Sequence, residues 1–299
     1  ENTVIPAQID GKSVTRIGNN AFEKSSAKEI VIPDSVTEIG SQAFSGCGKL
    51  TGVSIPNSVT MIRDRAFFDC NSLASITIPD SVTDIELQAF CNCTSLKSVT
   101  IPASVTDIGD EAFGYYFNDI DESEIKKVDG FKINYVKNTY GHYYATKNGF
   151  SDEDCIITNE LNDGTLEISK YVGNSATSAT YVIPGEINGK KVTQIGDSAF
   201  TVCTSLTSVT IPDGVTSIDE AAFWGCTSLT SVTIPDSVTS IKSKAFFNCT
   251  SLKSVTIPAS VTNINIGDYA LGYYEIYNTD SCEWEMYKVD GFKINYVKN

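Results

Sequence analysis

Nine cysteines and a single histidine are the residues of this chain that could carry redox, metal or nucleophilic chemistry. Six of the cysteines follow a phenylalanine by three positions, and subtraction of neighbouring numbers within each group of three gives 23. If neighbouring units stack at a strand spacing of about 4.8 Å, disulfides between them are geometrically possible, but a group of three leaves an odd thiol. We therefore expect buried, reduced thiols that fill the interior as small apolar groups: Cys47, Cys70, Cys93, Cys203, Cys226 and Cys249.

The remaining candidates for metal or nucleophilic chemistry are isolated in the sequence. Cys91, Cys155 and Cys282 lie outside the regular series and have no obvious partner, and only Cys91 and Cys93 are close enough to begin a zinc motif. A catalytic device that uses histidine could form only around His142, which lies among tyrosines. A packing or surface role is the simpler interpretation, so we predict no enzyme, no metal and no cofactor.

An acidic run from Asp119 to Glu124 resembles the opening of a calcium-binding loop. Such a loop needs glycine at its sixth position and a bidentate glutamate at its twelfth. Glu124 and Gly130 stand at those two positions instead. We interpret the run as a solvated acidic loop.

These residues belong to a sequence motif that repeats along the chain. From Ser35 to Pro102, three copies of Ser-Val-Thr-x-Ile-x-x-x-Ala-Phe-x-x-Cys-x-x-Leu-x-x-Val-x-Ile-Pro follow one another, each 23 residues long. The Leu-x-x-Val-x-Ile part predicts a short strand that proline closes, and the part with Ala-Phe suits a bent segment that ends in a short helical turn. One unit cannot bury its own apolar face, so stacked units must share a core. The period predicts an α/β repeat solenoid of leucine-rich repeats, with one short parallel strand per coil.

The repeated motifs also resemble a known family. Ile-Pro at the end of the strand, Ile-Gly-x-x-Ala-Phe on the return and Cys-x-x-Leu before the next strand are similar to the BspA-like leucine-rich repeats of bacterial and protozoan surface or secreted proteins. The resemblance implies a solenoid at the bacterial cell surface or outside the cell. Since some relatives act as adhesins, it also implies a role in recognition.

Interruptions of the repeated motif divide the chain into four expected parts. Residues 1–114 form a first array of five coils, and residues 115–150 form a non-repeat tail that covers its end. Residues 151–271 form a hairpin followed by a second array of four coils, and residues 272–299 repeat the tail in truncated form. Both ends of the chain look cut from something longer.

Local patterns predict the elements outside the coils. In the first tail, alternation predicts a strand at Lys132–Tyr135, Asp129-Gly130 a tight turn, and the segment from Thr139 to Asn148 a helix that ends before Gly149. The segment from Cys155 to Val172 predicts a β-hairpin that pairs with the first coil of the second array.

Composition excludes several partners. The net charge of −15 and the isoelectric point near 4.5 oppose binding to nucleic acid or anionic membranes. No stretch approaches the roughly 18 apolar residues that a membrane helix needs, so we expect no direct membrane insertion of this segment.

Candidate partner contacts are the aromatic residues of the tails and return segments. The strands carry a uniform face of small hydroxyl side chains, such as Ser98 and Thr100, which is flat and poor in interface anchors. The aromatic residues either cover the array ends or contact a protein or glycan: Tyr115, Tyr116, Trp224, Phe247, Tyr273, Tyr274 and Trp284. We predict an extracellular recognition or adhesion module. The alternatives are a passive structural spacer and a carbohydrate-binding protein that uses the tail aromatics.

Overall fold

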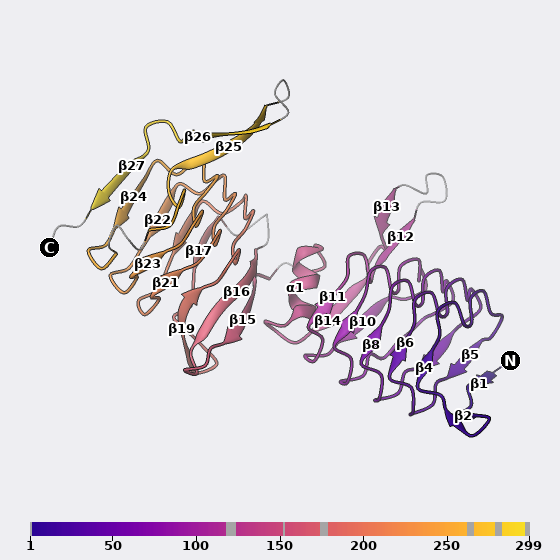
Figure 1. The fold of residues 1–299 in the computed structure, drawn as a ribbon. Coiled ribbons are helices and arrows are strands. Elements are labelled where there is room, and N and C mark those ends of the chain that lie inside the picture. The colour runs from indigo at the N-terminus through magenta and orange to yellow at the C-terminus, as the bar shows by residue number, and fades with distance from the viewer. Residues whose placement is uncertain are drawn as a thin grey trace. The chain divides into compact units, whose positions relative to one another are not determined.

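The computed structural model describes residues 2–117, 124–151, 153–173, 179–261, 266–278 and 283–296, with the backbone alone at 276–278, 283–285 and 296. The chain divides into two compact units, residues 1–151 and 152–299, called unit 1 and unit 2 below. Each unit is a stack of coils around a hydrophobic core of its own (Figure 1). Residues 119–123 of the predicted acidic run and Cys282 lie outside the described residues, as does the side chain of Trp284.

Coils of unit 1 contribute short parallel strands to two ladders, where the sequence predicted one strand per coil. In both ladders, paired residues such as Ile39 and Ile62 lie 23 positions apart wherever the coils have equal length. The first ladder consists of β1 (Asn2–Val4), β5 (Glu29–Val31) and β7 (Gly52–Ser54). The second ladder consists of β4 (Arg16–Ile17), β6 (Glu38–Ile39), β8 (Met61–Ile62), β9 (Asp84–Ile85) and β11 (Asp107–Ile108).

Unit 1 begins with a small antiparallel hairpin and ends with the predicted tail elements. The predicted strand, turn and helix of the tail are confirmed, and Gly149 follows the helix with a positive φ of 63°. The strand pairs in parallel with the last long strand of the array, and the helix packs on the tail strand and on β11. These elements are β2 (Gln8–Ile9), β3 (Lys12–Ser13), β10 (Ser98–Ile101), β12 (Tyr115–Phe117), β13 (Ile125–Lys127), β14 (Lys132–Tyr135) and α1 (Tyr140–Lys147).

Unit 2 begins with the predicted β-hairpin. β15 (Cys155–Glu160) and β16 (Leu166–Val172) pair antiparallel, and β16 pairs in parallel with β19 (Lys190–Ile195) of the first coil, which confirms the prediction. The ladders of unit 2 include β17 (Thr180–Val182), β20 (Ser208–Thr210), β21 (Ser217–Ile218), β22 (Ser231–Thr233) and β23 (Ser240–Ile241). Outside them, β18 (Glu186–Ile187) pairs antiparallel with β19. The unit ends with β24 (Ser254–Ile257), β25 (Tyr273–Asn278), β26 (Glu283–Lys288) and β27 (Lys293–Tyr296).

The α/β class overstates the helix content, because α1, with eight residues, is the one α-helix within the described ranges. The Ala-Phe segment forms turns, and its amides bond to the next coil: the Phe67 N–H donates to the Ala89 carbonyl at 2.8 Å. Just before this segment, Arg65 and Gln88 have φ values of 53° and 54°. An α-helix of L-residues does not contain this left-handed conformation, so the return segment stays a chain of turns.

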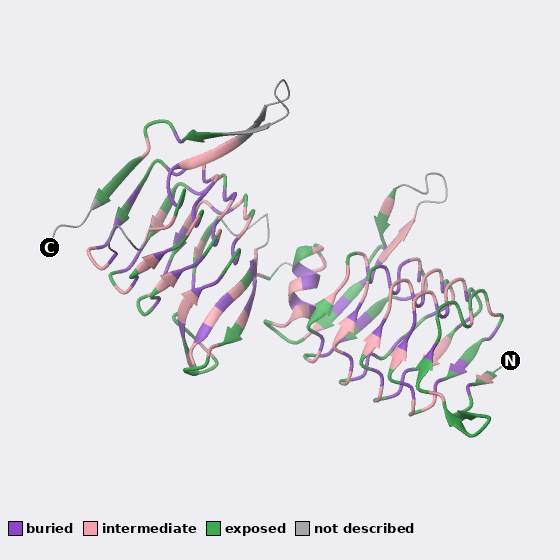
Figure 2. Cartoon of the chain, viewed as in Figure 1, coloured by how far each residue is buried: buried purple, intermediate pink, exposed green. Residues whose placement is uncertain are grey.

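Phenylalanine side chains form the centre of each core. The rings of Phe67, Phe90 and Phe113 stack with centroid distances of 5.0 and 4.8 Å. In unit 2, Phe223 stacks on Phe246 at 5.0 Å. Each of these rings is at most 1% exposed, and burial of such a side chain stabilises a fold by about 1.5–3 kcal/mol. Figure 2 shows the resulting pattern, in which buried positions recur from coil to coil.

The regular cysteines lie beside these rings as free thiols. The Sγ of Cys70 donates to the Phe44 carbonyl at 3.2 Å, and the Sγ of Cys226 donates to the Phe200 carbonyl at 3.1 Å. Cys93 and Cys249 repeat this contact one coil further on. The thiol therefore fills interior volume and gives a hydrogen bond to a buried carbonyl.

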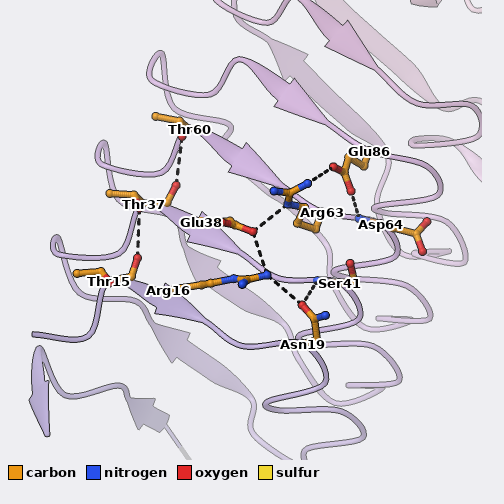
Figure 3. A network of polar contacts seen from close by, with 10 residues as sticks. All are labelled: Thr15, Arg16, Asn19, Thr37, Glu38, Ser41, Thr60, Arg63, Asp64 and Glu86. Atoms are coloured by element: carbon orange, nitrogen blue, oxygen red, sulfur yellow. Dashed lines mark hydrogen bonds and ion pairs between the residues drawn. The ribbon is translucent and has the colours of Figure 1, made fainter.

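Threonines link neighbouring coils along the second ladder. The backbone N–H of Thr60 donates to the Thr37 carbonyl at 2.9 Å, and that of Thr37 donates to the Thr15 carbonyl at 2.9 Å (Figure 3). Both hydroxyls donate to the same carbonyls at 3.3 Å. These bonds fix the register between coils at the exposed edge of the core.

Candidate functional site

The aromatic residues predicted as partner contacts in the first tail pack partly against other residues of unit 1. The Tyr115 hydroxyl donates to Oδ1 of Asn148 at 2.9 Å, and its ring meets Phe150 edge-on at 5.6 Å. Burial raises the pKa of the Tyr115 hydroxyl. Tyr116 is half-buried and packs against the core of unit 1.

Phe247 does not contact a partner, because its side chain is 0% exposed. The strand β25 attaches to the coil at the next residue. Asn248 anchors that strand, since its backbone N–H donates to the Tyr273 carbonyl at 2.8 Å and its Oδ1 accepts from the Glu275 N–H at 3.0 Å. Trp224, at the equivalent position one coil earlier, is half-buried and keeps part of its surface in solvent.

Tyr273 and Tyr274 are half-buried on the hairpin of β25 and β26. The Lys288 Nζ lies 5.7 Å from the Tyr273 ring centroid, and the Tyr274 ring stacks on Tyr287 at 5.6 Å. The predicted aromatics therefore lie on separate hairpins and on a coil, and the described contacts do not join them into one site.

A groove opens instead on the long-strand face of unit 1, where the first ladder is interrupted. The sheet of β1, β5 and β7 ends two coils before β10, and β10 pairs with β14. Between them the coil passes through Ile76, Thr77 and Ile78 without forming a strand. The groove between this coil, β10 and β14 has a volume of about 600 Å³.

The groove of unit 1 is lined by hydroxyl, amide and carboxylate groups above apolar side chains. Thr77, Thr100 and Asp80 are exposed, and the Asn134 side-chain amide donates to the Thr100 hydroxyl at 3.4 Å. The Ser104 hydroxyl is buried and has no hydrogen-bond partner within the described chain. A buried polar group in this state is costly unless a bound molecule satisfies it.

The other serines in this column show what is different about Ser104. The Ser81 hydroxyl donates to the Val59 carbonyl at 2.7 Å, and the Ser260 hydroxyl donates to the Val238 carbonyl at 2.6 Å. Ser104 is the column member that lines the larger groove. Its hydroxyl thus lies beside the groove without the carbonyl partner that Ser81 and Ser260 have.

At its tail end, the unit 1 groove is bounded by a fixed aromatic side chain. The ring of Tyr135 stacks on His142 at 4.4 Å, and its hydroxyl lies 2.6 Å from the Ser151 hydroxyl. His142 is 0% exposed, and its Nδ1 accepts from the Asn138 N–H at 3.1 Å. His142 therefore packs and orients Tyr135, in agreement with the packing role predicted for it.

Unit 2 has a groove of about 300 Å³ at the equivalent place. β22 and β24 belong to separate sheets there, and β24 pairs with β27. Six lining residues follow their unit 1 counterparts by 156 positions each: Val232, Thr233, Ile234, Asp236, Thr256 and Pro258. The interruption of the ladder and the groove are therefore repeated features of the two units.

The charges of the grooves favour donors of hydrogen bonds. Asp80 and Asp236 are exposed acids at the groove edges, and no lysine or arginine is among the described lining residues. The carboxylate of each groove can accept hydrogen bonds, and its hydroxyls can both donate and accept them. This combination suits a polypeptide or a neutral glycan. An anion is disfavoured because the carboxylate would repel it.

A charged cluster on the second ladder is neutralised from within. Arg63 bonds Glu38 and Glu86 at 2.8 Å each, and Arg16 reaches Glu38 at 3.1 Å (Figure 3). These carboxylates raise the pKa of the Arg63 guanidinium. The network links coils and leaves little net charge for a partner.

Metal and thiol chemistry receive no support in the described part of the chain. No group of three or more His, Cys, Asp or Glu side chains there is arranged to hold a metal ion. Burial raises the pKa of the Cys91 and Cys155 thiols to about 12 each. Such thiols are protonated at neutral pH and poor nucleophiles.

Sequence reasoning missed the grooves because it treated the hydroxyl face as flat. One signal was present: the twelve residues identical in both tails include Asn134 and Asn295. The tail strands place these amides in register with Thr100 and Thr256. The interruption of the ladder one coil earlier has no sequence signature, since Ser-x-Thr-Ile-Pro is present there too.

The fold is a solenoid of stacked parallel-strand coils, which is the leucine-rich repeat architecture, and each unit carries one polar groove. The model for the BspA type leucine rich repeat region matches residues 11–139 and 147–282 in six copies. The chain belongs to this family, which confirms the resemblance seen in the sequence. No curated protein matches the chain.

Solved structures of bacterial leucine-rich repeat proteins are similar to the chain. One from Bacteroides ovatus is 27% identical over 87% of this chain and 76% of its own, with a TM-score of 0.43. A leucine rich cell surface protein from Faecalibacterium prausnitzii is 26% identical over the same shares, with a TM-score of 0.36. One from Bacteroides capillosus is 30% identical over 48% of this chain and 94% of its own, with a TM-score of 0.37.

Within the described residues, no helix is both long enough and apolar enough to cross a membrane.

Proposed function

We propose that this chain is a non-catalytic recognition or adhesion module that acts outside the cell or at the bacterial cell surface. Its ligand is a protein or a glycan, and we assign binding to the grooves at Thr100 and Thr256. The observation that carries the proposal is the repetition of one polar groove at equivalent residues of two units. Membership in the BspA-type family supports the surface location and the recognition role.

The proposal extends to the organisation of the chain. Two arrays of 23-residue repeats, residues 1–114 and 151–271, are each followed by a tail, residues 115–150 and 272–299. Each tail adds a strand, β14 or β27, beside the last long strand of its array, and β14 lines the unit 1 groove. A tail in this role both covers the array end and completes a binding site.

The first test is binding of the full chain to a mixed array of matrix proteins, mucins and plant and host polysaccharides at physiological salt. We expect saturable retention of at least one component at micromolar or lower concentration. Lysine in both grooves, Thr100→Lys with Thr256→Lys, is expected to weaken that binding at least tenfold, because the added side chain occupies the groove.

The matched control places the same change in the same columns outside the grooves. Ser54→Lys with Thr210→Lys alters exposed positions on β7 and β20, and we expect at most a twofold effect. Equal losses in both double variants would show that the added charge, and not the groove, is responsible.

Two other outcomes identify the competing functions. If no component is retained by the folded chain, the uniform hydroxyl face supports a passive spacer. If alanine at Tyr273 and Tyr274 abolishes retention and the groove variants do not, binding belongs to the tail aromatics.

A further inference from the structure

Trp224, predicted from the sequence as a partner contact, lies on a coil of unit 2 and keeps part of its surface in solvent. Equivalent positions in other coils hold Phe68, which is half-buried, and Phe247, which is 0% exposed. Trp224 is not among the described lining residues of the unit 2 groove. A role for this side chain is therefore separate from binding in the grooves.

In the coils of Phe68 and Phe247, a cation lies over the aromatic ring. The Arg65 Cζ is 5.6 Å from the Phe68 ring centroid, and the Lys244 Nζ is 5.8 Å from the Phe247 ring centroid. Each cation precedes its ring by three residues in the sequence. Both distances are within the roughly 6 Å over which a cation is attracted to a ring face. The geometry of the coil thus brings these two positions together as a cation–π pair.

Ala221 occupies the position of the cation in the coil of Trp224. Its φ of 54° matches the 53° of Arg65 and the 56° of Lys244, so the backbone conformation is the same in all three coils. No lysine or arginine of the described chain lies over the Trp224 ring. Indole attracts cations more strongly than the other aromatic side chains do. The ring of Trp224 is therefore open to a cation from another molecule.

Two acidic residues lie beside this position. Glu220 directly precedes Ala221, and its backbone N–H donates to Oδ1 of Asp197 in the preceding coil at 3.0 Å. Both acidic side chains are exposed, and neither forms an ion pair with a described residue. In the coil of Phe68 the corresponding acid, Asp64, is followed by Arg65. The coil of Trp224 keeps the acid and lacks the arginine.

The lysines of the following coil are already engaged with other groups. Lys242 forms an ion pair with Asp219 at 3.1 Å, and Lys244 lies over Phe247. The charges around Trp224 therefore favour an incoming cation.

We propose a second binding site, named the indole site, that takes an arginine side chain of a partner polypeptide. It consists of Asp197, Glu220, Ala221 and Trp224. The guanidinium stacks on the indole as Arg65 lies over Phe68, and the two carboxylates attract its charge.

Arginine fits the indole site better than lysine does. Its planar group stacks on aromatic rings and presents a fork of N–H donors that matches a carboxylate. The occupied coil of unit 1 shows both kinds of contact in one side chain. While it lies over Phe68, Arg65 donates from Nε to Oε1 of Gln88 at 2.7 Å.

The first experiment titrates the full chain with the peptide acetyl-Gly-Arg-Gly-Arg-Gly-amide at low salt, where charge is screened least. We expect saturable binding by calorimetry, and at least tenfold weaker binding of the analogue with citrulline, which has a similar shape and no charge. With Trp284→Phe, Trp224 is the remaining tryptophan, so its emission should change with the same saturation. Equal binding of the two peptides, or unchanged emission, overturns the proposal.

Substitutions then separate the indole from the general charge of the chain. Trp224→Leu keeps every charge and should weaken binding of the arginine peptide at least about fivefold. Ala221→Arg should weaken it as much, because the new side chain covers the ring from within the coil. The fold should accept this change, since Arg65 has the same φ.

The control for Ala221→Arg is Gln42→Arg. Gln42 has the same positive φ of 56°, but the residue three positions further on is Ser45. It adds the same charge and covers no ring, so we expect at most a twofold effect. Unchanged binding in Trp224→Leu, or equal losses in the two arginine variants, overturns the proposal. If Trp224→Leu does not fold, the comparison of the two arginine variants decides.

Discussion

At the scale of single residues, equivalent positions of successive coils form a column along the solenoid. Each column tends to keep one backbone conformation, whichever residue occupies it. The second residue after most core phenylalanines has a positive φ, and most occupants are glycine, asparagine or aspartate, as at Gly46, Asp69 and Asn92. These residues tolerate the left-handed region better than others. Val202 is the β-branched residue in this set, with φ of 58°, and it is 52% exposed.

Val202 is therefore a position where a substitution should stabilise unit 2. A β-branched residue in this conformation costs of order 1–3 kcal/mol, and the exposed side chain returns little by packing. We expect Val202→Asn to raise the free energy of unfolding by about 1 kcal/mol, measured by urea denaturation. Val182→Asn, at an exposed valine in β17, should give no gain, and an equal gain in both variants would refute the argument from strain.

A second prediction at this scale concerns pH. Burial raises the pKa of the Cys91 thiol from its ordinary value of 9.0 to about 12, so the folded chain keeps a proton that the unfolded chain loses. Unfolding then releases protons above pH 9, and the stability falls as pH rises from about 9 towards 12. Below pH 9 this thiol contributes no pH dependence.

The measurement is the urea midpoint at neutral pH and at about pH 10.5, between the two pKa values of the Cys91 thiol. The parent chain should lose more stability between these conditions than Cys91→Ala, which lacks the retained proton. Identical losses would mean that the Cys91 proton is not linked to folding.

Single residues also mark the limit of the sequence analysis. The period located the buried phenylalanines and cysteines, because each repeats in a fixed column. Phe247 was predicted as a partner contact, but its side chain is buried beside Asn248, the residue to which β25 attaches from outside the repeats. Comparison of equivalent positions in successive repeats cannot detect a strand that comes from outside the repeats and contacts one coil.

At the scale of elements, the tails matter because they attach to the coil before the last through equivalent asparagines. The Asn92 Oδ1 accepts from the Phe117 N–H at 2.7 Å, as the Asn248 Oδ1 accepts from the Glu275 N–H. In unit 1 the helix α1 then packs on β14, and Gly141 lies against Ile101 of β10. The tail is thus part of the folded array end.

This packing predicts that Gly141 tolerates no side chain. A Cβ there would lie 2.9 Å from Ile101 and 3.4 Å from Tyr135, so Gly141→Leu should displace α1. We expect a loss of about 1–3 kcal/mol in unfolding free energy and faster hydrogen exchange in β10 and β14. Gly48→Leu, where the space is open, should have little effect, and unchanged stability of both variants would contradict a closely packed tail.

Elements differed in how far the sequence could predict them. The strand 132–135, the helix and the hairpin 155–172 followed from alternation, capping and turn residues. The second ladder of two-residue strands was not predicted, because so short a strand has no period of its own and is defined by bonds to neighbouring coils.

At the scale of the whole molecule, duplication explains why similar polar surfaces occur twice and why repetition is a poor basis for a catalytic centre. Repetition places the same small polar side chains along each face, whereas catalysis needs unlike groups that converge. The grooves arise where the repetition is interrupted, at the same coil of each unit. The sequence predicted the solenoid but not these interruptions, since they depend on how strands separate and not on residue type.

The central claim is that both grooves bind the partner, and hydrogen–deuterium exchange of the full chain tests it most directly. The chain is measured alone and with a saturating amount of the component that the binding array retains best. The account predicts protection at residues 76–78 and 100–102 and at their copies, residues 232–234 and 256–258. Protection confined to the hairpin of β25 and β26, or no component retained at micromolar concentration, would contradict it.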